Sequence, residues 1–340
     1  MIAAVPRRII QAPMAGVQNA GLTLAADRSG AMGSLPAAML GPEGLDRELA
    51  RLQAEGSGPF NVNFFAHVAP QPDPAREAAW RDSLRRFYDA LGLDPAAVPG
   101  GASRQPFNEA LAEVLEARPP AVVSFHFGLP APALLTRVRR LGVAVWSSAT
   151  TLREARWLQA QGVDAVIAQG LQAGGHRGHF LDTDPALQQD TAALLRQLVP
   201  ALRLPVIAAG GIGTADTVRA ALADGAAAVL AGTAYLLCPE ASTSAPHRVA
   251  LQDPGARSVL TNLFSGGLAR GLVNRLVQEM GAVSPLAPAF PLAAAALAPL
   301  RARAEAGGLG DFSPLWAGSA FADARPVPAA DVTRALSQGL

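Results

Sequence analysis

Few side chains in this sequence combine a reactive group with a position at the end of an apolar run. Asn63, His126 and Gln169 each lie toward the C-terminal end of such a run. In a parallel α/β barrel these strand ends meet at one face, where ligands bind. The set holds amides and one imidazole, without a carboxylate pair and without the context of a Ser/His/Asp triad. The chain also has no lysine, which excludes a Schiff base and a P-loop lysine.

The stretch from Pro205 to Leu237 contains two turns that lack bulky side chains. Gly210 and Gly211 follow one apolar run, and Gly232 and Thr233 follow the next. Backbone N–H groups in such turns, close to a helix N-terminus, bind phosphate, and TIM barrels place this site after strands seven and eight. The letters GGIGTAD lack the third glycine and the later acidic residue of a dinucleotide fingerprint. The stretch therefore predicts a phosphate-anchored organic cofactor that carries the chemistry.

Eight apolar runs alternate with helical patterns, which is typical of a parallel α/β architecture. The expected strands are Ile9 to Met14, Ala31 to Leu35, Phe60 to Phe65, Ala121 to Phe127, Ala144 to Ser148, Ala165 to Gln169, Pro205 to Ala209 and Ala227 to Ala231. The expected helices, with apolar residues three and four apart, are Leu22 to Arg28, Pro42 to Ala54, Asn108 to Glu116, Pro132 to Arg140, Leu152 to Gln161, Pro185 to Leu198 and Thr214 to Ala223. Together they predict a TIM (β/α)8 barrel.

Two segments exceed what a minimal barrel needs. His67 to Gln105 has proline-rich ends and a helical centre from Arg76 to Leu91, and we expect it on the ligand-binding face. The second segment follows the last strand and has helix-like patterns over Ala256 to Met280 and Leu292 to Ala306. It predicts a helical cap over the barrel mouth, inserted after strand eight. The expected domains are a barrel of residues 1–237 and 311–340 and a cap of residues 238–310.

Composition limits the cellular compartment and the classes of binding partner that we expect. A chain of 340 residues with 50% hydrophobic and 16% charged residues can bury a large core. A net charge of +1 favours neither nucleic acid nor an anionic membrane as a partner. The single Cys238 excludes an internal disulfide, the N-terminal residues lack the order of a signal peptide, and the run Leu286 to Leu300 is short and broken by prolines. We expect a soluble cytoplasmic protein, either a monomer or a homodimer.

Eight motifs resemble, in the same order, those of the class I nitronate monooxygenases, formerly called 2-nitropropane dioxygenases. They are QAPMAG (Gln11 to Gly16), SLPAAML (Ser34 to Leu40), NVNFFAH (Asn61 to His67), VSFHFGLP (Val123 to Pro130), QGLQAGGHRG (Gln169 to Gly178), AAGGIGTAD (Ala208 to Asp216), LAGTAYLLCPEA (Leu230 to Ala241) and LWAG (Leu315 to Gly318). The resemblance covers almost the whole chain. It implies a TIM barrel with a helical cap and an FMN enzyme that oxidises alkyl nitronates, notably propionate 3-nitronate, with O₂.

The resemblance also implies roles for individual residues. His126 would be the catalytic histidine, and His176 would lie on the substrate side. The residues that would line FMN are Pro13, Met14, Ala15, Asn63, Gln169, Gly174, Gly175, Gly210, Gly211, Leu230, Ala231, Gly232 and Thr233. The chain departs from the family pattern at Gln172, Gly267 and Ser319, and it lacks the tyrosines and the lysine that some members place near the substrate. These departures concern the choice of nitronate more than the binding of FMN.

His126 has a structural reading and a catalytic one. A histidine at a strand end can serve packing alone, but the barrel position and the motif favour function. Between Phe125 and Phe127 the imidazole would be partly desolvated, which favours its neutral form. A neutral imidazole can take the α-proton of a nitroalkane, whereas it can only position or polarise a substrate that is already a nitronate.

Other readings remain open at this stage. His176, His179 and Asp182 are spaced three apart, but the glycines around them favour a loop, and we expect no metal there. His67 and His247 are expected to be structural or surface residues. An FMN barrel that oxidises NAD(P)H to reduce a quinone or an enoyl thioester is the alternative enzyme, and a barrel that only stores or senses a phosphorylated ligand is the non-enzymatic alternative.

Overall fold

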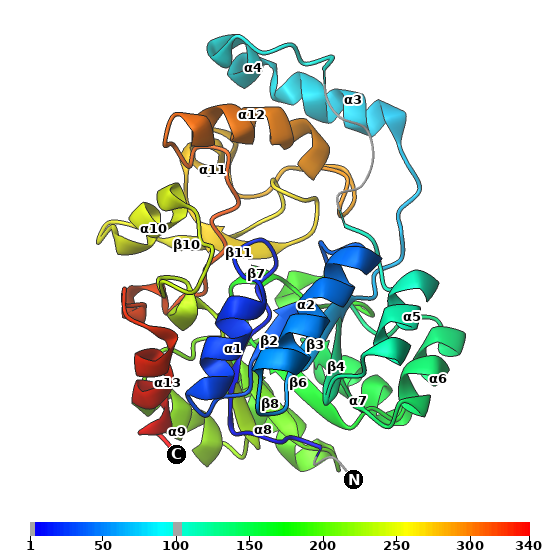
Figure 1. Cartoon of the computed structure of the whole chain (residues 1–340). Helices are drawn as coiled ribbons and strands as arrows, with labels where there is room; N and C mark the ends of the chain where they lie inside the picture. The colour runs from blue at the N-terminus through cyan, green and yellow to red at the C-terminus, as the bar shows by residue number, and fades with distance from the viewer. Residues whose placement is uncertain (1–3, 98–103) are drawn as a thin grey trace.

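The computed structural model describes residues 4–97 and 104–340 (Figure 1). Residues 98–103 of the segment from His67 to Gln105, and the first three residues of the stretch considered as a signal, lie outside the described residues. No helix within the described ranges is long and apolar enough to cross a membrane.

Eight parallel strands of the described chain form the barrel. They are β1 (Ile9–Gln11), β2 (Ser34–Pro36), β3 (Asn61–Phe65), β4 (Val122–His126), β5 (Ala144–Ala149), β6 (Ala165–Gln169), β8 (Val206–Ala209) and β9 (Ala228–Ala231). Neighbours follow the order β1-β9-β8-β6-β5-β4-β3-β2. The ends of this order meet where Ile10 forms a parallel bridge with Met32, just before β2. The predicted barrel is therefore confirmed, with strand ends shifted by up to three residues.

Alternating side chains divide the core into two layers. In β6 and β8 one set, which includes Ile167 and Ile207, belongs to a cluster that fills the barrel, while Val166 and Val206 pack outward against the helices. This alternation is what a strand buried on both faces requires. Trp146 is fully buried in the inner cluster, and its indole N–H donates to the carbonyl of Ala4 (2.7 Å).

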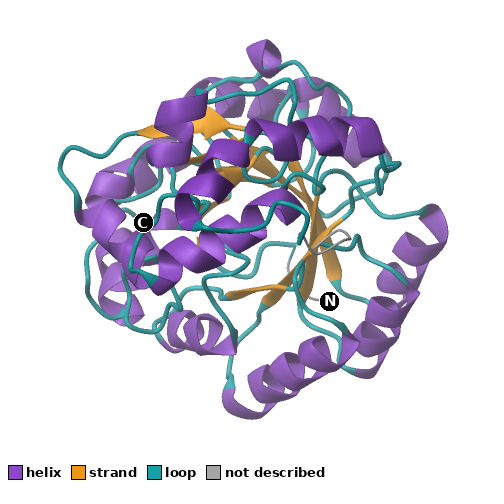
Figure 2. Ribbon diagram, turned by 90° about the horizontal axis from the view of Figure 1, so that it is seen from above, coloured by secondary structure: helices purple, strands orange, loops and turns teal. Residues whose placement is uncertain are grey.

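The strands are surrounded by a ring of helices (Figure 2). Its members are α1 (Ala20–Arg28), α2 (Pro42–Glu55), α5 (Glu109–Ala117), α6 (Pro132–Arg140), α7 (Leu152–Ala160), α8 (Thr191–Ala201), α9 (Ala215–Ala223) and α13 (Ala329–Ser337). The last of these comes from the C-terminal return segment and packs between α1 and α9. The expected helix from Pro185 to Leu198 instead begins at Thr191, because the Asp190 carboxylate caps it at Ala193 N–H (2.7 Å), and only a 3₁₀ turn, Pro185–Leu187, precedes it.

The helix expected over Ala256 to Met280 is wrong for most of its length. The segment forms β10 (Ser258–Thr261) and β11 (Ala269–Leu272), and only α11 (Arg275–Met280) is helical. The turn between the strands contains Gly266 at φ +88°, where a Cβ would lie 1.9 Å from the carbonyl oxygen of Pro288. On its other edge β11 pairs with β7 (Gly175–His176), which lies in the connection from β6 to β8. Pairing between segments so far apart in sequence overrides local helical spacing.

The inserted segments pack on one another above the barrel mouth. α3 (Pro74–Ser83) and α4 (Arg85–Leu91) lie on α12 (Ala294–Ala306) in Figure 1, and Leu84 separates what was expected as one helix. Trp80 donates its indole N–H to the carbonyl of Ala293 (3.1 Å), and the hydroxyl of Tyr88 bonds the carbonyl of Ala296. The remaining cap helix is α10 (Ala245–Gln252). The division at residues 237/238 and 310/311 stays a prediction.

One buried carboxylate joins the barrel to the loop that follows β7. Glu154, in the first turn of α7, is fully buried. It accepts hydrogen bonds from the N–H and hydroxyl of Thr150 (both 2.8 Å) and from the N–H groups of Phe180 (2.6 Å) and Leu181 (3.2 Å). These four bonds satisfy the charge away from water and fix the loop at residues 180–181.

We predict that Glu154→Ala lowers the free energy of unfolding by about 3 kcal/mol, because it leaves buried N–H groups without an acceptor. Glu43→Ala is the control, since this exposed glutamate also lies in the first turn of a helix, and it should change stability by less than about 0.5 kcal/mol. Urea unfolding followed by circular dichroism measures both values. Equal effects of the two substitutions would contradict a fastening role for Glu154.

Candidate active site

His126 lies at the carboxyl end of β4, and both of its ring nitrogens have partners. Nε2 is 3.1 Å from the carbonyl oxygen of His176, and Nδ1 is 2.9 Å from Oγ of Ser148 at the end of β5. A carbonyl can only accept, so Nε2 carries the proton and Nδ1 accepts from the serine hydroxyl. Burial, followed by the charge of Arg177, lowers the pKa of His126 to about 4, and the bond to His176 opposes this change. The imidazole is therefore neutral at pH 7, as predicted.

The backbone turns sharply directly after His126. Phe127 has φ +69°, a left-handed conformation that is costly for a bulky residue, and Gly128 follows at φ +88°. The turn brings the Phe127 ring to 4.7 Å from the His126 ring and 6.1 Å from the His176 ring, measured between centroids. Strained backbone of this kind concentrates at functional sites, because the surrounding structure must hold it in place.

His176 is tied to the barrel by its backbone and to the cap by its side chain. Its carbonyl accepts from His126 and also from Nε2 of Gln169 (2.8 Å), and Oε1 of Gln169 accepts from Gly178 N–H (2.7 Å). On the other side, Nε2 of His176 is 2.8 Å from Oγ of Ser265. Burial, and then the charge of Arg104, lowers the pKa of His176 well below its usual value. The structure thus brings together three residues that the sequence placed in the site.

Aromatic rings from the barrel and the cap surround the two histidines. Phe65, from β3, has its ring centroid 5.8 Å from His126 and 6.1 Å from His176. From the cap side, Phe290 and Trp316 lie 4.9 Å and 5.3 Å from His176. Such a lining excludes water and leaves an apolar surface for a flat ring or a short carbon chain.

The glycine turns after β6, β8 and β9 meet at one place. A Cβ on Gly211 would lie 3.4 Å from Cβ of Gln172, and a Cβ on Gly318 would lie 2.6 Å from the Gln172 carbonyl. Gly318 N–H in turn donates to the hydroxyl of Thr233 (2.9 Å). Turns that are far apart in sequence therefore form one wall of the barrel mouth, as the glycine pattern indicated.

Close backbone contacts explain why glycines stand in this wall. A Cβ on Gly174 would lie 2.5 Å from the N of Gly318, and one on Gly210 (φ +114°) would lie 2.8 Å from the N of Ala173. Within the described ranges, Gly211 and Thr233 donate their backbone N–H groups to no recorded acceptor. The turn leads into α9, whose N-cap is Thr214. Unshielded N–H groups beside a helix N-terminus fit the phosphate end of a flavin nucleotide.

The other predicted cofactor residues have different surroundings. Pro13, Met14 and Ala15 follow β1, and Sδ of Met14 lies 3.5 Å from where Gly232 would carry a Cβ. Asn63 is nearly buried and donates to Oγ of Ser124 (2.9 Å).

Three further members of the predicted set lie on strands. Leu230 packs against the inner cluster, whereas Ala231 is fully buried on the helix side of β9. Ala231 can therefore meet a ligand only through its backbone. Gly175 (φ +74°) pairs with Arg270 of β11 in the cap sheet.

A buried arginine holds the loop on which His176 lies. Arg177 is fully buried and donates to the carbonyls of Gln169 and Gly170 and to Oε1 of Gln188 (2.6 Å each). Burial, followed by the charge of Arg270, lowers its pKa to about 10, so it stays protonated near neutral pH. The guanidinium thus caps the end of β6 and places a positive charge close to His126.

His179, Asp182 and Cys238 make contacts away from the two site histidines. Nδ1 of His179 is 3.4 Å from Nε2 of Gln188, and Asp182 pairs with Arg153 (2.6 Å). Across the described ranges, no three His, Cys, Asp or Glu side chains gather into a metal-binding group. Burial raises the pKa of the Cys238 thiol to about 12, which keeps it protonated.

Sequence reasoning missed several members of the site. Ser148 lies near the end of a strand, and this position could have marked it, whereas Ser265 and Phe290 come from the cap and show no spacing signal. Trp316 belongs to the LWAG motif, but no role was predicted for it. Gln172 and Ser319, two of the noted departures, contact each other through Ser319 N–H and the Gln172 carbonyl (3.0 Å).

The third departure, Gly267, lies beside Phe290, whose Cβ would be 3.3 Å from a Cβ on the glycine. Its carbonyl is 3.4 Å from Oγ of Ser265, the partner of His176. A larger residue at this position would therefore press on the wall next to His176.

Comparisons with known proteins agree on one family. The family model described as nitronate monooxygenase matches residues 1–339. A protein of Pseudomonas aeruginosa named nitronate monooxygenase is 41% identical, over 98% of this chain and 95% of its own length. A protein of the same name from Paraburkholderia phytofirmans is 39% identical, over 99% of this chain and 93% of its own length.

Solved structures share the fold of this chain. The nitroalkane oxidase of Streptomyces ansochromogenes superposes with a TM-score of 0.89 at 38% identity, covering 98% of this chain and 95% of its own. FabK of Thermotoga maritima superposes with a TM-score of 0.71 over 99% of this chain and 94% of its own, and at 23% identity it shares the fold alone. The chain belongs to the nitronate monooxygenase family of flavin-dependent oxidoreductases.

Proposed function

We propose that the protein binds FMN and uses O₂ to oxidise alkyl nitronates of the propionate 3-nitronate type. The observation that carries this proposal is the arrangement around β7. One connection bears Gly174, which packs against Gly318 in the wall of glycine turns, and His176, whose carbonyl is held by His126 and Gln169. A phosphate-binding end and a reactive end are thereby joined within a single loop.

The glycine turns would hold the phosphate, with N–H groups from Gly211 and Thr233 as donors. Pro13, Met14 and Ala15 would back the ring system, and Asn63 and Gln169 would line it. The chemistry that FMN supplies when bound is electron transfer between a nitronate and O₂, with cleavage of the C–N bond to give a carbonyl compound and nitrite or nitrate. The protein's own part is to bind, to orient and to exclude water.

His126 can act in two ways, depending on the substrate. For a neutral nitroalkane, Nδ1 holds the lone pair that would take the α-proton, and the Ser148 hydroxyl must first turn away from it. For a nitronate no proton needs to leave, so the ring only positions or polarises the bound anion. Phe65 and Phe290 exclude water from both processes.

The decisive experiment is anaerobic mixing of the flavin-loaded protein, after identification of the bound flavin by chromatography. We expect FMN to copurify and propionate 3-nitronate to reduce it, whereas NADH leaves it oxidised. Bleaching by NADH without any response to the nitronate would instead favour a reductase. The likeness to FabK does not argue for that alternative, because it concerns the fold alone.

We predict that Gly211→Val weakens FMN binding at least about ten-fold, since it places a branched side chain at the phosphate wall and costs one or two charge-assisted hydrogen bonds. Gly142→Val is the matched control: its φ of +71° is close to that of Gly211 (+74°), and no atom lies within 4 Å of its Cβ position. Fluorescence titration of the two apoproteins with FMN measures the difference. Equal losses would mean that backbone strain, and not the phosphate wall, is responsible.

We predict that His126→Asn retains FMN and loses about 10²- to 10⁴-fold in kcat/KM on neutral nitroalkanes, with a smaller loss on nitronates. Because the pKa of His126 is about 4, the neutral base persists as pH falls and is lost only when pH passes below that value. The pH profile of kcat/KM of the wild type for a neutral nitroalkane should therefore show no inflection near pH 6.5 that could be assigned to His126 by its loss in His126→Asn. Similar, small losses on both substrates would contradict the assignment as a base.

A further inference from the structure

A cavity of about 260 Å³ opens between residues 67–77 and 104–106 on one side and residues 291–292, which precede α12, on the other. Four of its ten lining residues are prolines: Pro70, Pro72 and Pro106 on the first side and Pro291 on the second. The volume is below that of a typical whole-ligand pocket, so the cavity suits one end of a small molecule. Proline rings keep such a wall rigid, because their backbone has little freedom.

Single aromatic rings lie between the cavity and the two histidines of the candidate active site. The Phe290 ring lies 4.9 Å from His67, which lines the cavity, and 4.9 Å from His176. Phe127 is placed in the same way, 6.1 Å from His67 and 4.7 Å from His126. Single aromatic rings therefore separate the cavity from the two histidines, a spacing that a short molecule passing beside these rings can span.

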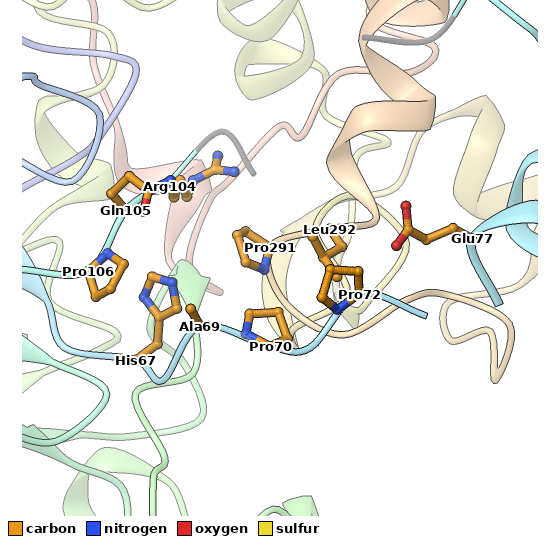
Figure 3. Close-up of a pocket in the computed structure, with 10 residues that line it drawn as sticks. All are labelled: His67, Ala69, Pro70, Pro72, Glu77, Arg104, Gln105, Pro106, Pro291 and Leu292. Atoms are coloured by element: carbon orange, nitrogen blue, oxygen red, sulfur yellow. The ribbon is translucent and has the colours of Figure 1, made fainter. Parts of the chain in front are cut away.

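The polar groups in this cavity are suited to an anion. Arg104 and His67 line the same side of it in Figure 3, and Glu77 lies at the far end. Nδ1 of His67 is buried and has no hydrogen-bond partner among the described residues. An imidazole N–H beside a guanidinium is a donor pair for a carboxylate.

The electrostatics point the same way. Burial, and then the charge of Arg104, lowers the pKa of His67 to about 4. Burial and the charge of Arg301 lower the pKa of Arg104 itself. A carboxylate in the cavity would offset both effects, because it brings a negative charge to a site where desolvation weakens the cation.

We propose that Arg104, assisted by His67, binds the carboxylate of an acidic nitronate whose nitronate end lies at His126 and His176. This rests on the proposed function and adds to it a residue that selects the substrate. The chain has no lysine, so a cation facing the substrate must be an arginine or a histidine. Arg104 lies beside the site without touching the reacting atoms, and its effect should therefore appear in KM more than in kcat.

The test compares two nitronates of equal carbon number, propionate 3-nitronate and propyl 1-nitronate, on the flavin-loaded protein. Arg104→Gln should raise KM for the acidic nitronate about ten- to hundred-fold and change KM for the alkyl nitronate less than two-fold. Arg85→Gln is the control, since this exposed arginine of α4 pairs with Asp82 outside the cavity, and it should leave both values unchanged. Equal losses on both nitronates in Arg104→Gln would overturn the proposal.

A second variant tests the sign of the effect. Glu77→Gln removes the negative charge at the far end of the cavity, so KM for propionate 3-nitronate should fall by a few-fold while KM for propyl 1-nitronate stays constant. A rise in KM for the acidic substrate would contradict an anion site.

Propionate separates a substrate subsite from a site for a free carboxylate. Competitive inhibition by propionate that Arg104→Gln weakens supports the subsite, whereas stimulation of propyl 1-nitronate turnover would assign the cavity to an effector and overturn the proposal. If wild type consumes neither nitronate, the proposed function fails. In that case, propionate binding measured by calorimetry still tests the anion site. Binding that is lost in Arg104→Gln and kept in Arg85→Gln would support the site, and no binding to the wild type would contradict it.

Discussion

The carbonyl oxygen of His176 is the atom on which the site depends most. It accepts hydrogen bonds from two barrel strands, through His126 on β4 and Gln169 on β6, while the residue itself belongs to a strand of the cap sheet. A carbonyl has two lone pairs, and both are used here. This single acceptor sets which nitrogen of His126 carries the proton. It also links the cap sheet to the barrel strands β4 and β6.

Two buried charges keep that loop in place by satisfying backbone groups. Arg177 donates to carbonyls at the end of β6, and Glu154 accepts N–H groups from the residues after the loop. Neither charge needs a direct ionic partner, since backbone dipoles replace the water that each one lost. The arrangement gives a rigid loop between the phosphate wall and the histidines, which suits a site that must hold its substrate in one orientation.

The barrel could be read from the sequence because its strands are short, continuous and apolar, and because glycine turns mark where several of them end. The clustering of the glycine turns was predictable for the same reason. The cap sheet was not, since β11 pairs with β10 and with the two-residue strand β7, which lies about 90 positions earlier, and such pairing produces no periodic pattern in the sequence. His126 could be recognised from its strand end and motif, whereas Phe290 lies in no motif and reaches the site only through tertiary packing. Trp316 lies in the LWAG motif, but the motif alone does not show that its ring contacts His176.

The two-residue strand β7 has a consequence for how the site can respond to motion. Because β7 belongs to a barrel connection and to the cap sheet at once, a shift of β11 that carried it along would withdraw the acceptor facing Nε2 of His126. The Nε2–H tautomer of His126 would then lose the hydrogen bond that favours it, since Ser148 can accept from Nδ1 as well as donate to it. Cap position and proton position are thus thermodynamically linked, so that whatever stabilises one arrangement of the cap also biases where the histidine keeps its proton.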